Sequence, residues 1–331
     1  LEHTAMAVGF NPRQVVYTPD SGTLVVASDA WLAVLDLTSS DLTPQMVQLS
    51  EDVVHPPVAE EIVVDPQGQY LFVRQYGAPS LLLVDLLTLE TTELPLSGTP
   101  TDLDLSPDGN TAAVVVRGSN ELVLIDTRDP QAQPLILDLP PDELLGSLVY
   151  SPTGERALLF TTAVPRARVT TWDIEDGTFV VRGLEKPVRS IKVSPDGGTA
   201  TIFHTLEDAE NADPDSIFNG QEALTMVDLT DFRSNALLLP KEPTAFVNSG
   251  DGRFGFFVME GSPYLEVLRY EDLLYDEVRL KSSPVHVGVL PGSTYAYVNE
   301  EHELGRLSFY EPDTGELKTI TGFELNSGIE H

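Results

Sequence analysis

The sequence contains no cysteine, only two tryptophans and five lysines among its 331 residues. The lack of cysteine excludes disulfides, thiolate metal sites and cysteine nucleophiles, but it leaves the cellular compartment open. The longest apolar run, residues 80–89, contains an aspartate and is too short to cross a bilayer, so we expect no membrane insertion. The chain begins with Leu1 and shows no basic-then-apolar leader, so we expect any signal peptide or lipid anchor to lie outside it.

Positive charge is also scarce. The chain has 19 lysines and arginines against 52 acidic residues, which gives a net charge of −33. Such a surface repels phosphate backbones and anionic lipids, so nucleic acid is excluded as a partner. The acid-rich, lysine-poor balance suits a salty or calcium-containing medium, and a merely solubilising surface is the alternative interpretation. The hydrophobic fraction, 41%, is large enough for a packed core.

A short turn sequence recurs along the chain. In the stretch LSPDGNTAAVVV, residues 105–116, a Ser-Pro-Asp-Gly turn leads into an apolar run. Similar turns stand at Pro19, Pro66, Pro152 and Pro195, with weaker copies in 247–258 and 289–298. After each turn come an apolar run, a variable loop, a third run that in five copies ends in aspartate, and a fourth run. These runs are rich in β-branched and aromatic residues and are bounded by Gly, Pro and Asp, so they predict strands.

The repeat predicts the fold. Four strands per unit, about 45 residues per unit and about seven units are typical of a β-propeller. We therefore expect an all-β, seven-bladed β-propeller of four-stranded antiparallel blades, formed as a single domain by residues 1–331; six or eight blades stay open as alternatives. We expect residues 4–8 to close the ring as a strand beside residues 316–320. The aspartates that end the third runs are expected to accept backbone N–H groups in turns, a structural role: Asp36, Asp85, Asp126, Asp173 and Asp228.

The turns and the third runs together carry a family resemblance. SPDG turns followed by runs such as LVLIDT (122–127), and the Trp-Asp pair in TWDI (171–174), resemble the YVTN-type and WD-repeat-like bacterial propellers, including the lactonase-like seven-bladed group. This resemblance covers the whole chain and implies the fold, not an activity. It implies an exported bacterial protein of the periplasm or cell surface. We expect a non-enzymatic binding or scaffold propeller that takes another protein or a small ligand at one face.

Alignment of the seven units on the turn proline predicts rings of side chains on the innermost strands. Residues four positions before the proline are apolar in every unit and are expected to pack between blades. Residues five positions before it are mostly polar and face the opposite side of the strand. They predict either a ligand site at the channel mouth or a solvated channel wall, formed by Gln14, Glu61, Asp102, Ser190 and His286, with Arg189 nearby. Two positions further along, Asp104 and Lys192 are expected to form a channel ion pair.

No enzyme motif accompanies these rings. The sequence has no Gly-x-Ser-x-Gly nucleophile elbow, no phosphate-binding glycine loop and no His-x-x-x-His metal pair. We therefore assign no catalytic residue, and the balance favours a protein that is not an enzyme. The alternative is a lactonase-type hydrolase with its site at the channel mouth, where His286, Glu61 and Asp102 could supply the chemistry.

An acidic insertion, residues 206–223, is expected between the second and third strands of blade five. Its segment 211–222 follows the spacing of a twelve-residue calcium loop, although serine replaces the usual glycine at position six and no flanking helices are evident. The alternative is a solvated acidic loop without calcium. The candidate Ca²⁺ ligands are Asn211, Asp213, Asp215, the Ile217 carbonyl, Asn219 and Glu222.

Overall fold

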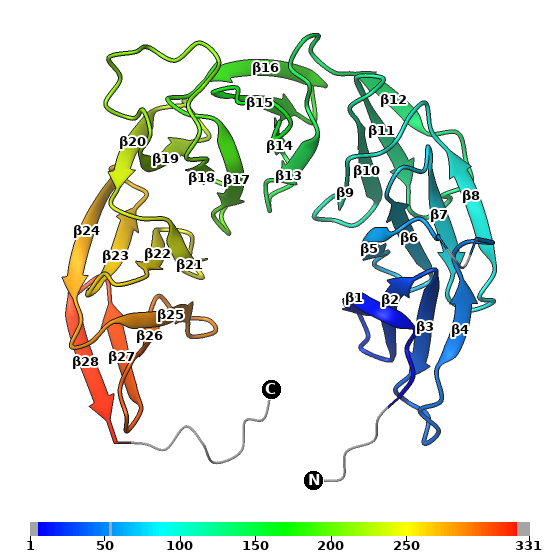
Figure 1. The fold of residues 1–331 in the computed structure, drawn as a ribbon, viewed down its shortest axis with the longest axis horizontal. Helices are drawn as coiled ribbons and strands as arrows, with labels where there is room; N and C mark the ends of the chain where they lie inside the picture. The colour runs from blue at the N-terminus through cyan, green and yellow to red at the C-terminus, as the bar shows by residue number, and fades with distance from the viewer. Residues whose placement is uncertain (1–5, 53–54, 323–331) are drawn as a thin grey trace. The chain divides into compact units, whose positions relative to one another are not determined.

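The computed structural model describes residues 6–52 and 55–322, and they form seven four-stranded sheets (Figure 1). The first three sheets hold β1 (Phe10–Tyr17), β2 (Thr23–Asp29), β3 (Trp31–Asp36) and β4 (Gln45–Gln48); β5 (Ala59–Val64), β6 (Tyr70–Gln75), β7 (Ser80–Asp85) and β8 (Thr91–Pro95); and β9 (Asp102–Leu105), β10 (Thr111–Val116), β11 (Glu121–Asp126) and β12 (Leu135–Asp138). The fourth holds β13 (Ser147–Tyr150), β14 (Arg156–Phe160), β15 (Arg168–Asp173) and β16 (Thr178–Gly183).

The last three sheets repeat this order. They hold β17 (Val188–Val193), β18 (Thr199–His204), β19 (Glu222–Asp228) and β20 (Ser234–Leu239); β21 (Pro243–Asn248), β22 (Phe254–Met259), β23 (Tyr264–Arg269) and β24 (Leu274–Arg279); and β25 (Pro284–Val289), β26 (Ala296–Glu300), β27 (Arg306–Glu311) and β28 (Glu316–Thr321). In every sheet, consecutive strands are neighbours. The predicted repeat of four strands is therefore confirmed in all seven copies.

In the described part of the chain, no helix has the length and apolar character needed to cross a membrane.

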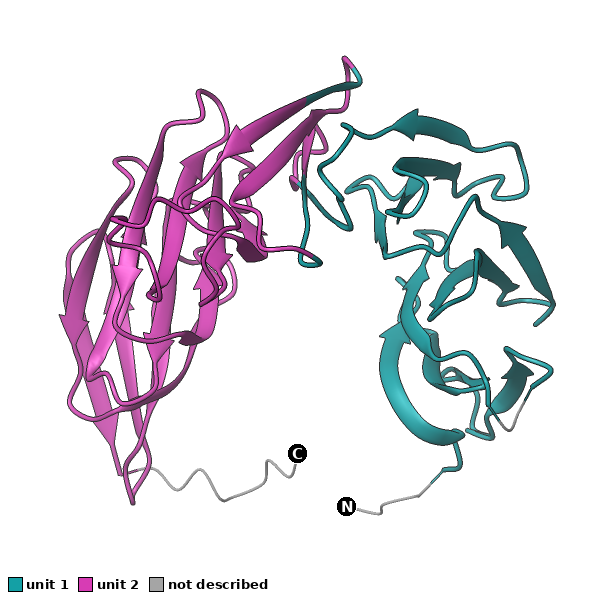
Figure 2. Ribbon diagram, turned by 45° about the horizontal axis from the view of Figure 1, so that its top comes forward, with its two compact units in different colours: residues 1–150, 159–163, 177–179 teal, residues 151–158, 164–176, 180–331 magenta. Residues whose placement is uncertain are grey.

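The chain divides into two compact units (Figure 2). The first contains residues 1–150, 159–163 and 177–179, and the second contains 151–158, 164–176 and 180–331. The first three sheets thus belong to the first unit and the last three to the second, while the strands of the fourth sheet are divided between them. Residues 4 and 5 lie outside the described residues, and 6–9 carry no strand. Ring closure by residues 4–8 stays a prediction.

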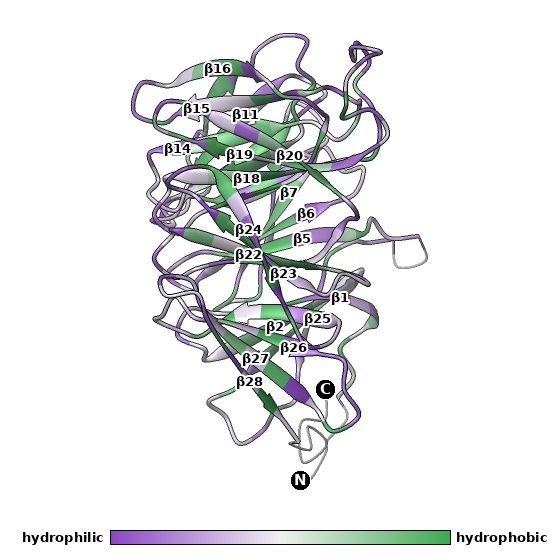
Figure 3. Ribbon diagram, turned by 90° about the vertical axis from the view of Figure 1, so that its left-hand side faces the viewer, coloured by the Kyte–Doolittle hydropathy of each residue, from purple (hydrophilic) through white to green (hydrophobic). Residues whose placement is uncertain are grey.

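Burial follows the position of a strand in its sheet. The second strands β18 and β22 are buried at every residue, whereas the fourth strands β16 and β24 are mostly exposed. A strand buried on both faces needs an almost continuous apolar sequence. This is why β22 reads FGFFVM and is coloured as hydrophobic in Figure 3.

The hydrophobic layers lie between consecutive sheets of a unit. In the first unit, Ile62 of the second sheet packs with Val25 and Leu32 of the first. In the second unit, Val287 of the seventh sheet packs with Phe256 of the sixth. The predicted apolar ring is thus buried at these positions, although Val15, its first member, is exposed.

The recurring turn joins the innermost strand of a sheet to the second strand, as predicted. In the third sheet, the Ser106 hydroxyl donates to Asp108 Oδ1 at 2.6 Å and accepts the Thr111 N–H at 3.0 Å. The N–H of Gly109 donates to the Ser106 carbonyl at 2.7 Å, and Gly109 has φ +69°. Such a φ favours glycine, because a Cβ would approach the following carbonyl oxygen.

The aspartates that end the third strands have the predicted structural role. Asp36 Oδ1 accepts the Thr38 N–H at 2.9 Å, and Asp228 Oδ1 accepts the Thr230 N–H at 2.8 Å. The other three aspartates also accept backbone N–H groups two or three residues onward. At Asp126, the hydrogen bond from the Arg128 side chain, together with the bond from the Arg128 N–H, lowers the pKa of the carboxyl group to about 2.

The Gly109 turn provides a test of packing between neighbouring sheets. A Cβ on Gly109 would lie 1.8 Å from Cγ of Pro66, in the corresponding turn of the second sheet. Gly109→Ala should therefore combine a left-handed backbone cost of about 1–2 kcal/mol with an overpacking cost of about 1–3 kcal/mol. Gly77→Ala is the matched control, because Gly77 has φ +75° and no atom within 4 Å of the added Cβ. Urea unfolding of both variants measures the two costs; equal losses would contradict the turn-to-turn contact.

Candidate functional site

The polar inner-strand positions of the first unit link neighbouring sheets. The Gln14 side chain on β1 donates to the Ile62 carbonyl at 3.1 Å and accepts the Ile62 N–H at 2.9 Å. One sheet further on, the Glu61 carboxylate lies beside the backbone N–H of Leu103, which favours the charged form of Glu61. In the next step, Asp102 Oδ2 accepts the Leu148 N–H at 2.5 Å. Three predicted ligand residues thus share one structural contact, a side chain that reaches the backbone of the following innermost strand.

These contacts bring acidic side chains together. Glu61 pairs in register with Arg74 of β6, and its carboxylate accepts Arg74 Nε–H at 3.0 Å. The other end of the guanidinium, Nη1, contacts Glu60. Burial raises the pKa of Glu61 and of Asp102, and the charge of Asp102 raises that of Glu61 further. A pocket on this surface is lined by Gln14, Glu60, Glu61 and Arg74.

Asp104 is the carboxylate that the linking contacts leave out. It lies two residues after Asp102 on β9, opposite Ala113 of β10, and its side chain receives no hydrogen bond from the residues that the structure describes. Burial, together with the charges of Asp102 and Glu61, raises its pKa to about 7. We call Glu61, Asp102 and Asp104 the inner acidic cluster. Arg74, which contacts Glu61, also contacts Glu60.

The remaining predicted residues lie in the second unit. Arg189 forms an ion pair with Glu242, which links the fifth and sixth sheets. Ser190 is paired in register with Phe203, and His286 of β25 is exposed. Lys192 is exposed and lies in a different unit from Asp104, so their ion pair stays a prediction. The structure thus brings Gln14, Glu61, Asp102 and Asp104 into one unit and places Arg189, Ser190, His286 and Lys192 in the other.

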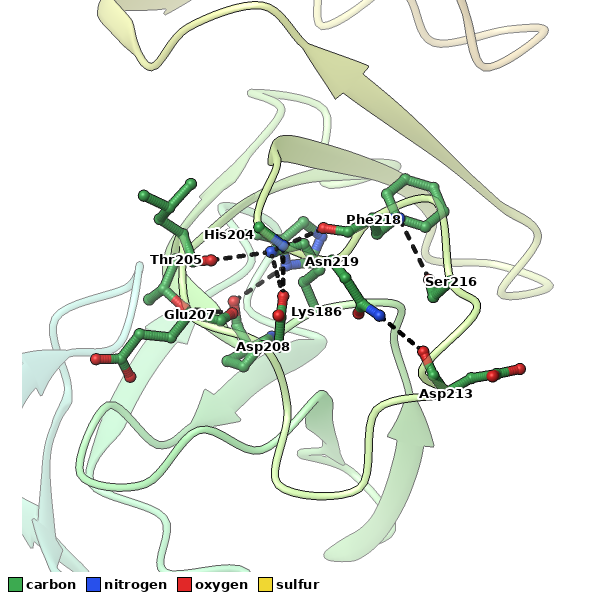
Figure 4. A network of polar contacts seen from close by, with 12 residues as sticks. Lys186, His204, Thr205, Glu207, Asp208, Asp213, Ser216, Phe218 and Asn219 are labelled. Carbon is green, nitrogen blue, oxygen red and sulfur yellow. Dashed lines mark hydrogen bonds and ion pairs between the residues drawn. The ribbon is translucent and has the colours of Figure 1, made fainter.

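The insertion after β18 is organised by a lysine that the sequence analysis missed. Lys186 is 1% exposed, and its Nζ donates to the carbonyls of Leu206 and Phe218 at 3.2 and 3.0 Å. It also donates to Asp208 Oδ1 at 3.2 Å (Figure 4), and the same oxygen accepts the Gly220 N–H. A single buried ammonium thereby holds both ends of the loop. The sequence signal was a lysine directly before Pro187, at the start of an innermost strand.

His204, at the end of β18, is enclosed beside this network. Its ring nitrogens contact the Pro187 carbonyl at 3.2 Å and the Thr225 hydroxyl at 2.7 Å. Burial lowers its pKa to about 4, so it is neutral near pH 7. A carbonyl can only accept, so Nδ1 carries the proton and Nε2 accepts from Thr225. His204 therefore has a structural role in the core of the fifth sheet.

The predicted calcium residues make contacts within the loop. The Asn219 amide donates to the Asp213 carbonyl at 2.8 Å, and Asp213 Oδ1 accepts the Asp215 N–H at 3.0 Å. Glu222 begins β19 and pairs with Leu239. No group of three or more histidine, aspartate or glutamate side chains in residues 6–52 and 55–322 is placed to hold a metal ion. Calcium binding here stays a prediction.

Comparison with known proteins supports the fold alone. No protein-family model matches the chain, and no curated protein sequence matches it. Among solved structures, Kuenenia stuttgartiensis hydrazine synthase is similar with a TM-score of 0.56 and 18% identity, over 96% of this chain and 97% of that chain. Dihydro-heme d1 dehydrogenase NirN in complex with DHE has a TM-score of 0.62 and 12% identity, over 95% and 67%.

One of the similar solved structures is a β-propeller domain. The Myceliophteria thermophila Cps50 (Swd1) β-propeller domain is similar with a TM-score of 0.52 and 11% identity, over 90% of this chain and 95% of that chain. With seven four-stranded antiparallel sheets, this likeness decides the fold class. The chain is a seven-bladed β-propeller. The propeller neighbours include enzymes as well as this domain, so they do not choose between the two functions considered above.

The raised pKa of Asp104 predicts a specific pH dependence. Its usual pKa is 3.8, so between about pH 4 and pH 7 the folded protein keeps a proton that the unfolded chain releases. Folding stability should therefore fall as the pH rises through this range. Asp104→Asn removes the effect and should raise the free energy of unfolding at pH 8 by about 2 kcal/mol, a value reduced for partial solvent screening.

Asp108→Asn is the control for this measurement. Asp108 lies in the exposed turn, where hydrogen bonds from Ser106 and Asn110 lower its pKa. Its replacement should therefore cost stability at pH 8 and not increase it. Urea unfolding between pH 4 and pH 8 measures both variants. A wild-type advantage over Asp104→Asn at pH 8 would contradict the assignment.

The buried lysine gives a second prediction. Lys186→Met should leave the Leu206 and Phe218 carbonyls without their donor and lower the free energy of unfolding by about 2–4 kcal/mol. Protease cleavage within 206–221 should become faster, because the loop loses the contact that joins its ends. Lys318→Met serves as the control, since the Lys318 side chain is 71% exposed. Unchanged cleavage in Lys186→Met would show that the loop is held by other contacts.

Proposed function

We propose that this propeller is a non-enzymatic binding protein that recognises a positively charged group at its inner acidic cluster. The support is Asp104, a partly buried carboxylate that accepts no hydrogen bond among the described residues and lies near two further carboxylates. Glu61 and Asp102 are explained by their contacts with neighbouring strands, whereas Asp104 is not. A cation placed beside it would offset the mutual repulsion of the three carboxylates, and the net charge of −33 would attract such a partner.

The proposal includes the narrower assignments made from the sequence. Membership of the YVTN-type, lactonase-like propellers is supported by the SPDG turns and by the aspartates that end the third strands. Location in the bacterial periplasm or at the cell surface is supported by that resemblance and by the acid-rich, lysine-poor composition. A partner protein or a small cationic ligand is consistent with the same surface. Calcium binding by residues 211–222 is proposed from the spacing of their oxygen ligands.

A titration with a short arginine-containing peptide at 0.15 M salt tests the cation site. Asp104→Asn should weaken binding by about 10- to 100-fold, the loss expected for one charge-assisted contact. Asp104→Glu should recover part of this affinity, whereas Asp108→Asn, with the same charge change in an exposed turn, should bind like the wild type. If Asp104→Asn and Asp108→Asn bound the peptide with equal affinity, the attraction would come from the general surface charge, and the site would be refuted.

The same variants distinguish the hydrolase alternative. An aspartate with a pKa of about 7 is suited to act as a general base near neutral pH, which is the observation that favours this alternative. Lactone hydrolysis that disappears in Asp104→Asn and persists in Asp108→Asn would establish it in place of the binding function.

A calcium titration of the wild type and of Glu222→Ala in a calorimeter tests the insertion. Identical heat in both proteins would remove calcium from the proposal.

A further inference from the structure

A buried carboxylate in the sixth sheet lines a pocket that is separate from the inner acidic cluster. Glu266 of β23 is 2% exposed, and it lies in register between Phe257 of β22 and Glu277 of β24. The pocket is lined by Pro240, Lys241, Met259, Tyr264, Glu266 and Glu277. All of these residues belong to the second unit. We call this cavity the Glu266 pocket.

Glu266 lacks the partner that the neighbouring sheets supply at this position. In the fifth sheet the corresponding residue is Thr225, which bonds to His204 at 2.7 Å. In the seventh sheet it is Ser308, which donates to the buried Glu300. His204 and Glu300 each stand two residues after the strand partner of that hydroxyl. In the sixth sheet this place is taken by Met259, which offers no hydrogen-bond donor.

One oxygen of the Glu266 carboxylate is left without a partner in the part of the chain that the structure describes. Glu266 Oε2 is buried and has no hydrogen-bond partner among the described residues. Glu277, directly opposite on the next strand, adds repulsion, since like charges on facing strand positions are destabilising. Burial and the charge of Glu277 together raise the pKa of Glu266 to about 7. A buried carboxylate without a donor is costly, so this residue points to a cationic ligand.

The walls of the pocket indicate which cation fits. Met259 and Tyr264 offer apolar surface for an alkyl chain, while Glu266 and the exposed Glu277 supply acceptors for its charged end. A metal ion is a poor match, because the described residues contain no group of three carboxylates or histidines placed to hold one. Lys241 also lines the pocket, yet no ion pair joins it to Glu266 or Glu277 in the described structure.

We propose that the Glu266 pocket binds the ammonium group of an aliphatic primary amine, with the carboxylate of Glu266 as its anchor. The amine is either a free alkylamine or the lysine side chain of a partner, and both present the same chemistry to the pocket. The carboxylate accepts the ammonium N–H bonds while the alkyl chain lies against Met259 and Tyr264. This site is independent of Asp104, so either assignment can fail without the other.

Calorimetry with n-butylammonium chloride at pH 8 tests the site. We expect one binding event in the wild type, weakened at least 10-fold in Glu266→Gln and unchanged in Glu271→Gln, an exposed control with the same charge change. Nα-acetyl-lysine-amide is the second probe. Tighter binding of this probe than of butylammonium indicates a partner lysine, and the reverse indicates a free alkylamine.

A second readout does not depend on any variant. Because the ammonium requires a charged Glu266, binding near pH 7 should release a proton, so the heat should differ between phosphate and Tris buffers, and affinity should fall below pH 6. Absence of binding by both amines at tens of millimolar, or equal affinity in wild type and Glu266→Gln, would overturn the proposal. So would amine binding that appears only in Lys241→Met, because Lys241 would then be the natural occupant.

Discussion

The packing of consecutive sheets against one another within each unit is the constraint on which the structure depends. Side chains of one sheet cover the inner strands of the sheet before it. Ile62 of the second sheet packs against the first sheet, and Val287 of the seventh packs against the sixth. This arrangement favours apolar residues on both sides of the second strands, whereas the fourth strands stay mostly exposed. It also brings turns of adjacent sheets into contact, which explains the close approach of Gly109 to Pro66.

The same constraint gives meaning to polar residues that occur on the inner strands. Gln14, Glu61 and Asp102 occupy corresponding places in successive sheets, and each reaches the backbone of the next innermost strand. Their polarity is thus required for joining sheets. Asp104 lies on the same innermost strand as Asp102, but its side chain accepts no hydrogen bond from the described residues. No contact within the described structure therefore offsets its charge. That difference separates a structural carboxylate from a candidate binding group.

Three buried charged groups in the second unit illustrate how such residues are accommodated. Lys186 is satisfied by two carbonyls and Asp208, and Glu300 by Ser308 and the Ser282 N–H. Glu266 has no equivalent donor for its Oε2. Because folding stability is a small difference between large terms, a protein retains an unsatisfied buried charge at a measurable cost. Such a residue is a stronger indication of a ligand than any exposed acidic cluster.

The fold was predictable because its information is local and repeated. The SPDG turns, the apolar strand runs and the aspartates at Asp36 and Asp228 each act within a few residues, so seven copies together define the strands and their order. The candidate site was predictable only as a set of polar positions, among them Gln14, Glu61 and Asp102. Arg74 was missed, since a single arginine in an apolar strand does not reveal which carboxylate it faces.

What the sequence by itself determined is the all-β repeat, the place of the insertion after His204 and the positions that are polar on the inner strands. What only the tertiary structure decided is whether each polar group is buried and which groups it forms hydrogen bonds with. The burial of Glu266 and of Lys186 is known only from the structure. The burial and the hydrogen-bond partners of a residue depend on segments that are distant in the sequence and close in the fold. Lys186 and Phe218, for example, are 32 residues apart in the sequence. Those contacts set solvation and pKa values, and no local pattern contains them.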